Sequence, residues 1–166
     1  MTSPCLRIFD RTGTARGELS LDIPVDRTTE AHREQWVEAT AAQGGRAMGG
    51  AIVPEAVRMI EVMAEAVGMA ERVPFANDLI VDDLGYMWIQ SWQLPDGSGS
   101  PEWRVFTETG REIGTVQLPE GFRVLVIATD AITGVRTDEL GRQFVQVHAL
   151  DRRGDLESRP PPPGCG

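Results

Sequence analysis

The sequence predicts a mainly β protein built from antiparallel hairpins, with two helices inserted in its first half. Three observations indicate this fold: a short motif occurs three times, its spacing matches a four-stranded unit, and one internal segment changes from alternating to helical periodicity. The chain has 166 residues, of which 41% are hydrophobic and 25% charged. This length suits one domain with a sizeable core.

The repeated motif is a strand that runs into a glycine turn. Residues 6–13 match residues 103–110 with Arg, Phe, Thr and Gly in step, and residues 147–154 keep the Asp-Arg-x-Gly of the first copy. An alternating strand followed by a polar turn, with a glycine that can take positive φ, is typical of a β-hairpin. We therefore predict that Gly13, Gly110 and Gly154 are hairpin glycines.

The spacing of the copies indicates how the strands are grouped. The second and third copies begin at positions 103 and 147, within the span of about 40 to 50 residues that a four-stranded propeller blade occupies. The first copy begins at position 6, so far from the second that an insertion is expected between them. Outside it, alternation predicts hairpins at 6–21, 78–92, 102–118 and 122–136 and a strand at 143–150, or about two and a half antiparallel propeller-like blades.

The insertion is predicted to be a pair of helices. Thr29 can cap a helix that runs to Gly44 and Gly45, and Pro54 suits the first turn of a second helix that Gly68 ends. The second helix carries an apolar stripe, which predicts packing on the sheets or, alternatively, a partner-binding surface that nearby methionines would make adaptable. The stripe comprises Val57, Ile60, Ala64 and Val67, and the methionines are Met48, Met59, Met63 and Met69.

The expected organisation therefore has four parts. They are a partial blade over residues 1–25, a helical insertion over 26–73, propeller-like blades over 74–154 and a proline-rich tail over 155–166. The composition of the tail is typical of an extended, disordered segment.

Four motifs in order give the chain a family resemblance. They are Asp82-Asp-Leu-Gly-Tyr-Met-Trp88, Trp103-Arg-Val-Phe106, Val116-Gln-Leu-Pro119 after Gly110-Arg111, and Gly134-Val-Arg-Thr-Asp-Glu-Leu-Gly141. Over residues 6–150 the sequence resembles the C-terminal, closing blades of bacterial six-bladed β-propeller proteins of the NHL-like kind, in truncated form. The resemblance implies the blade fold and, from the usual members, export to the periplasm, whereas the lack of a visible signal peptide predicts a cytoplasmic protein.

An incomplete propeller has consequences for its surface. A six-bladed ring needs roughly 250 to 300 residues, so we expect this chain not to close a ring on itself and to leave edge strands and blade faces uncovered. Val81, Ile89, Val105 and Val124 are expected on these open faces. A protein partner covering them would bury above about 1,000 Å².

Polar residues at the strand ends are the candidates for chemistry. Propeller hydrolases place calcium or catalytic carboxylates where Asp82 and Asp83 lie. We favour instead a solvated turn aspartate that accepts from its own backbone, and we favour the same explanation for the other turn acids. Those other acids are Asp130, Asp138 and Glu139. We assign no catalytic, cofactor-binding or metal-binding residue and expect no cofactor.

The remaining candidates have structural interpretations. No carboxylate or serine motif accompanies His32 or His148, and neither Ser91 nor Ser98 has a nucleophile-elbow context. No helix follows the glycines at 110 and 114, so they form a hairpin and not a phosphate loop. The tryptophans are expected in the cores of the blades and of the insertion; they are Trp36, Trp88, Trp92 and Trp103.

Charge and composition exclude several partners. The net charge of -9 argues against a nucleic-acid surface, which needs clustered positive charge. No apolar run is long enough to span a bilayer. Cys5 and Cys165 are expected to be free thiols in loose ends, with no metal bound.

Two classes of function are compatible with these features. The first is a non-enzymatic interaction or scaffold protein, a truncated propeller that serves as an extrinsic subunit of a larger assembly, for which membrane complexes of respiration or photosynthesis are examples. The alternative is the C-terminal fragment of a propeller hydrolase acting on small esters or lactones. An enzyme would need carboxylates from several blades to converge, and about two and a half blades supply few.

Overall fold

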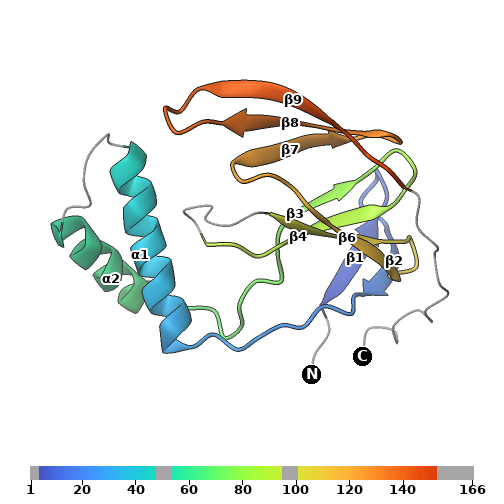
Figure 1. Ribbon diagram of the computed structural model, residues 1–166. Helices are drawn as coiled ribbons and strands as arrows, with labels where there is room; N and C mark the ends of the chain where they lie inside the picture. Colours follow the sequence, from blue (N-terminus) through green and yellow to red (C-terminus); the bar gives the residue numbers. More distant parts are fainter. Residues whose placement is uncertain (1–3, 48–53, 95–100, 153–166) are drawn as a thin grey trace. The chain divides into compact units, whose positions relative to one another are not determined.

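The computed structural model describes residues 4–47, 54–94 and 101–152 and is mainly β, with three antiparallel sheets and two helices (Figure 1). The two-stranded sheet contains β1 (Cys5–Phe9) and β2 (Ala15–Ser20). The four-stranded sheet contains, in spatial order, β3 (Ala76–Val81), β4 (Met87–Ser91), β5 (Glu102–Phe106) and β6 (Glu112–Gln117). The three-stranded sheet contains β7 (Phe122–Ile127), β8 (Ala131–Thr137) and β9 (Gln143–Ala149).

The chain divides into two compact units. All three sheets belong to one unit, formed by Met1–Val25, Phe75–Ser91 and Ser100–Gly166, and both helices belong to the other, formed by Asp26–Pro74 and Trp92–Gly99. The predicted antiparallel hairpins are confirmed, because each predicted range holds two paired neighbouring strands. The number of propeller blades stays a prediction.

Four hairpin turns of the sheets have the same construction. Each begins with Asp or Thr and has a glycine three residues later; these pairs are Asp10 and Gly13, Asp82 and Gly85, Thr107 and Gly110, and Asp138 and Gly141. In each turn the glycine N–H donates to the carbonyl of the first residue, and the glycine φ lies between 77 and 85°. Glycine adopts this left-handed conformation without steric cost, which explains the repeated motif.

The four-stranded sheet lies between the other two and contributes to two apolar cores. On β4, Trp88 points into the core shared with the three-stranded sheet, while its neighbours Met87 and Ile89 point into the core shared with the two-stranded sheet. The alternation of a strand therefore supplies both faces of the middle layer. Figure 1 shows the three sheets as successive layers.

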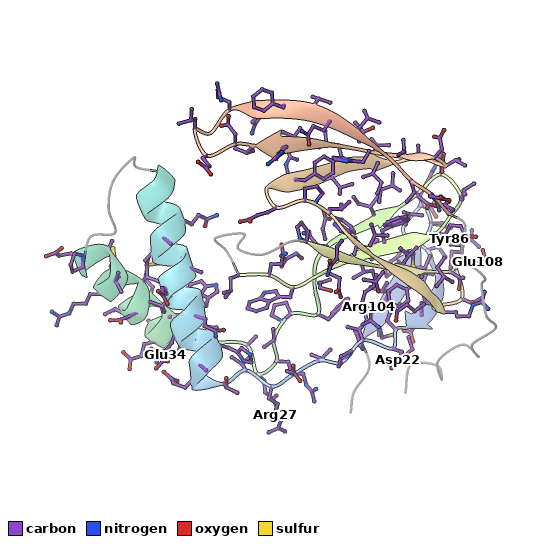
Figure 2. All side chains as sticks on the ribbon, viewed as in Figure 1. Asp22, Arg27, Glu34, Tyr86, Arg104 and Glu108 are labelled. Carbon is purple, nitrogen blue, oxygen red and sulfur yellow. The ribbon has the colours of Figure 1, made fainter. Side chains whose placement is uncertain are left out.

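A polar contact accompanies the second of these cores. Arg104 forms an ion pair with Glu112 within the four-stranded sheet and also donates to the carbonyl oxygen of Asp22, just beyond β2, at 2.9 Å. Figure 2 labels Arg104 and Asp22. The side chain thus links the middle sheet to the layer that precedes it in the sequence.

The helical unit agrees with the sequence in type and differs in one boundary. Helix α1 (Glu30–Ala47) passes through Gly44 and Gly45 instead of ending there, which corrects the predicted end. Glycine weakens a helix by only about 1 kcal/mol, so it does not by itself terminate one. Helix α2 (Pro54–Val67) begins at Pro54 as predicted and packs against α1; of its apolar stripe, Ala64 is buried and Val67 is exposed.

Two further predictions are wrong. Ile89, Val105 and Val124 are buried instead of exposed, because the three sheets stack on one another; only Val81 of that set is exposed. Cys5 is disulfide-bonded instead of free, and it lies in a paired strand, opposite Ser20, instead of in a loose end. The predictions for Met48, Ser98, Gly154, Cys165 and residues 155–166 fall outside the described residues.

Two turn glycines provide a test of the sheet stacking. Gly110 and Gly141 have nearly equal φ, but a Cβ on Gly110 would lie 2.7 Å from the carbonyl oxygen of Ser20, whereas a Cβ on Gly141 would meet nothing within 4 Å. Gly141→Ala should cost about 1 to 2 kcal/mol from the left-handed backbone alone. Gly110→Ala should cost about 1 to 3 kcal/mol more, from overpacking against the two-stranded sheet. Urea unfolding of both variants measures the difference, and equal losses would show that these layers are not in close contact.

Candidate interaction surface

Asp82 is a buried carboxylate at the turn between β3 and β4. Its Oδ1 accepts hydrogen bonds from the backbone N–H groups of Leu84 and Tyr86, at 3.0 and 2.9 Å. Its Oδ2 accepts from the indole N–H of Trp88 at 2.9 Å and from the guanidinium of Arg152 at 2.8 Å. Both oxygens are therefore occupied by donors, and the side chain is fully buried.

Arg152 ties this carboxylate to the three-stranded sheet. Its guanidinium also donates to the carbonyl oxygens of Ala128 and Thr129, in the turn between β7 and β8, at 3.0 and 2.7 Å. The cation lies 5.6 Å from the ring centre of Tyr86 and 5.7 Å from that of Trp88. One side chain thus joins the turn of one sheet to the turn of the next.

A second carboxylate makes a similar connection. Oδ2 of Asp83 accepts from the backbone N–H and the hydroxyl of Thr129, at 3.0 and 2.9 Å. The two neighbouring aspartates therefore both contact the three-stranded sheet. They act as structural links between layers, a role that their positions in the sequence do not indicate.

The electrostatics of Asp82 follow from these contacts. Burial alone would raise its pKa, but the hydrogen bonds from Trp88, Arg152 and the backbone of Tyr86 outweigh burial and hold the pKa below its ordinary value. The carboxylate is therefore ionised at neutral pH. Because donors occupy both of its oxygens, the ionised carboxylate has no free lone pair that could accept a proton from a substrate. We therefore assign it a structural role.

The other predicted acids remain apart from this cluster. Asp138 accepts from the backbone N–H groups of Leu140 and Arg142 and from the guanidinium of Arg142, which lower its pKa, with the backbone bond of Arg142 contributing most. Glu139 is exposed in the same turn, and Asp130 is exposed in the turn between β7 and β8. These acids occupy the ends of different hairpins.

The histidines and tryptophans have structural surroundings. His32 accepts from the backbone N–H of Thr29 at the start of α1, and the ring of His148 stands edge-on to Phe122 at 4.8 Å. Trp88 and Trp103 are buried core residues as predicted, while Trp36 and Trp92 are half-buried, as is Ser91. In residues 4–47, 54–94 and 101–152, no three His, Cys, Asp or Glu side chains gather as a metal site would require.

A hollow in the helical unit carries charges that are already paired. It has a volume of about 320 Å³ and lies at the start of α1. Its arginines, Arg27 and Arg33, form ion pairs with Glu71 and Glu30. The paired acids cancel the positive charge that would attract an anion.

The outer face of the three-stranded sheet is apolar and exposed. Opposite neighbours on this face form two rows across the sheet, Val126–Thr133–Val147 and Arg123–Val135–Val145. Val126, Val145 and Val147 are all more than half exposed, and Leu125 beside them is 45% exposed. We call this set of residues the open face. Contiguous exposed apolar surface is typical of an interaction site.

The sequence repeat explains why this surface is apolar. Leu6, Trp103 and Val147 occupy the first position of the three motif copies. Leu6 packs against the core between the two-stranded and four-stranded sheets. Trp103 is only 1% exposed, in the core between the four-stranded and three-stranded sheets. Val147 is 65% exposed. The first motif position therefore packs against the next sheet along the chain wherever the described residues include one. This repeated position is the sequence signal that could locate the open face.

Comparison with known proteins finds no match for this chain among protein-family models, curated proteins or solved structures. Within the described part of the chain, no helix is both long and apolar enough to cross a membrane. The stacked sheets and their open face are thus the features from which a function has to be argued.

Two aspartates in the same kind of turn provide a matched test of the buried contact. Asp82→Asn keeps the size of the side chain but removes the charge that faces Arg152, so it should lower the free energy of unfolding by about 3 to 5 kcal/mol, as breaking a buried ion pair does. Asp138→Asn, whose partner Arg142 is largely exposed, should cost much less, because solvent screens that ion pair. Denaturant unfolding measures both losses. Similar losses would mean that Asp82 is only an ordinary turn residue.

Proposed function

We propose that the protein is a non-enzymatic interaction module, a stack of propeller-like blades that enters a larger assembly as an extrinsic subunit. The observation that carries this proposal is the open face, because the motif position that Val147 occupies there packs into an apolar core in the two preceding sheets. Apolar area removed from water stabilises by about 25 cal/mol per Å². Covering the open face with another protein is therefore favourable, and a membrane complex of respiration or photosynthesis is one kind of assembly that would use such a subunit.

The state of the carboxylates favours this proposal over the hydrolase alternative. A calcium-dependent hydrolase needs acids with free oxygens that converge on one substrate. Asp82 and Asp83 instead bind donors of the neighbouring sheet, and Asp138 binds its own turn. These acids support the stacking of the sheets, which in turn presents the open face.

Site-specific photo-crosslinking tests whether the open face contacts another protein. A photoreactive amino acid at position 147, within the open face, should give crosslinked adducts with a protein chain on irradiation. The same amino acid at position 140 is the control, because Leu140 is similarly exposed but lies in the turn between β8 and β9. Mass spectrometry of the adducts identifies the attached chain.

The crosslinking outcomes separate the two functions. Adducts from position 147 and not from position 140 support the interaction module. Adducts from neither position, together with ester or lactone hydrolysis that Asp82→Asn abolishes without unfolding the protein, would contradict it and favour the hydrolase.

A further inference from the structure

The two-stranded sheet also has exposed residues on its outer side, and they too follow the motif. Phe9 and Phe106 occupy the fourth position of the first two copies. Phe106 is 0% exposed, in the core between the four-stranded and the two-stranded sheet, whereas Phe9 is 56% exposed. This motif position therefore packs against the preceding sheet when there is one, and the two-stranded sheet has none within the described residues.

The arginine at the second motif position follows the same pattern as the phenylalanine at the fourth. Arg104 reaches the carbonyl oxygen of Asp22 in the preceding layer. Its counterpart Arg7, on the same side of β1 as Phe9, forms an exposed ion pair with Glu18 across the hairpin. The outer side of the two-stranded sheet thus carries Phe9 and Arg7. Their counterparts in the four-stranded sheet, Phe106 and Arg104, contact the preceding layer. We call it the rear face.

We propose that two copies of this chain associate head to tail, with the open face of each stacked on the rear face of the other. This proposal rests on the proposed function and names its partner as a second copy. The open face carries the motif position that packs against the next sheet in the two preceding sheets. The rear face carries the motif position that packs against the previous sheet in the four-stranded sheet. One chain carries both, so association of two copies covers both ends at once.

A dimer that covers both ends of the stack has to be a closed assembly. A head-to-tail contact forms a ring if the rotation between copies closes, and an open filament if it does not. The described residues of each chain form three sheets, so those of two copies form six, which lies within the range of about four to eight sheets found in propeller rings. The ring of two copies leaves neither face exposed, and its mass is twice 18.2 kDa.

The charge of the chain predicts how the dimer responds to salt. Each copy has a net charge of -9, so the two copies repel one another at low ionic strength. Salt screens this repulsion and strengthens apolar association. The dissociation constant of the dimer should therefore fall as sodium chloride is raised.

Sedimentation equilibrium of the full chain over a range of concentrations tests the proposal. A monomer–dimer equilibrium without larger species is expected. Val147→Glu and Phe9→Glu, one substitution on each face, should each raise the dissociation constant at least about 100-fold, as loss of a central apolar contact does. Leu140→Glu adds the same charge outside both faces and should change the constant less than about threefold. Circular dichroism verifies that all three variants stay folded.

A mixture of the two face variants distinguishes head-to-tail from symmetric pairing. Phe9→Glu keeps an intact open face and Val147→Glu an intact rear face, so their equimolar mixture should form a heterodimer with one interface, detectable by native mass spectrometry. If Phe9→Glu alone still forms the dimer, two open faces meet each other and the head-to-tail proposal is wrong.

Two other results would overturn the proposal, and they differ in what they mean for the proposed function. A wild-type chain that stays monomeric at all concentrations, but whose position 147 crosslinks to a different protein, would refute self-association and keep the interaction module. A monomer that gives no adducts from position 147 would refute both.

Discussion

The contact between the Asp82 carboxylate and the Arg152 guanidinium joins the four-stranded sheet to the three-stranded sheet. The carboxylate organises its own turn through two backbone N–H groups, fixes the indole of Trp88 in the core, and receives a cation from beyond the last strand. A buried charge without these partners would be strongly destabilising. Local turn geometry and packing between sheets therefore depend on the same four oxygen–donor contacts.

Stacking gives each sheet two different sides, and the repeated motif determines which side chain lies on each. Position one packs forward and position four packs backward, as Trp103 and Phe106 show within a single strand. At the two ends of the stack the same positions, Val147 and Phe9, remain in solvent. The surface available for interaction is thus a direct consequence of the rule that builds the core.

The hairpins and helices could be predicted because their signals are local. A glycine three residues after Asp or Thr marks four of the hairpin turns, and Pro54 marks the start of α2. The role of Asp82 could not be predicted, because its partner Arg152 is 70 residues away in sequence. The exposed faces were assigned to the wrong residues, Ile89, Val105 and Val124, because alternation shows that a strand has two sides but not which side another sheet covers.

A carbon-13 NMR titration of the Asp82 carboxyl tests the central contact most directly. Because its pKa is lowered in the folded state, the ionised group stabilises the fold above the ordinary value of about 3.9, and this contribution is lost as the pH falls through the lowered value. We predict a midpoint below the ordinary value, with the Trp88 indole proton shifting at the same midpoint, and a higher midpoint in Arg152→Gln. A midpoint above the ordinary value in the unmodified protein would mean that burial outweighs the donors, and would contradict the account.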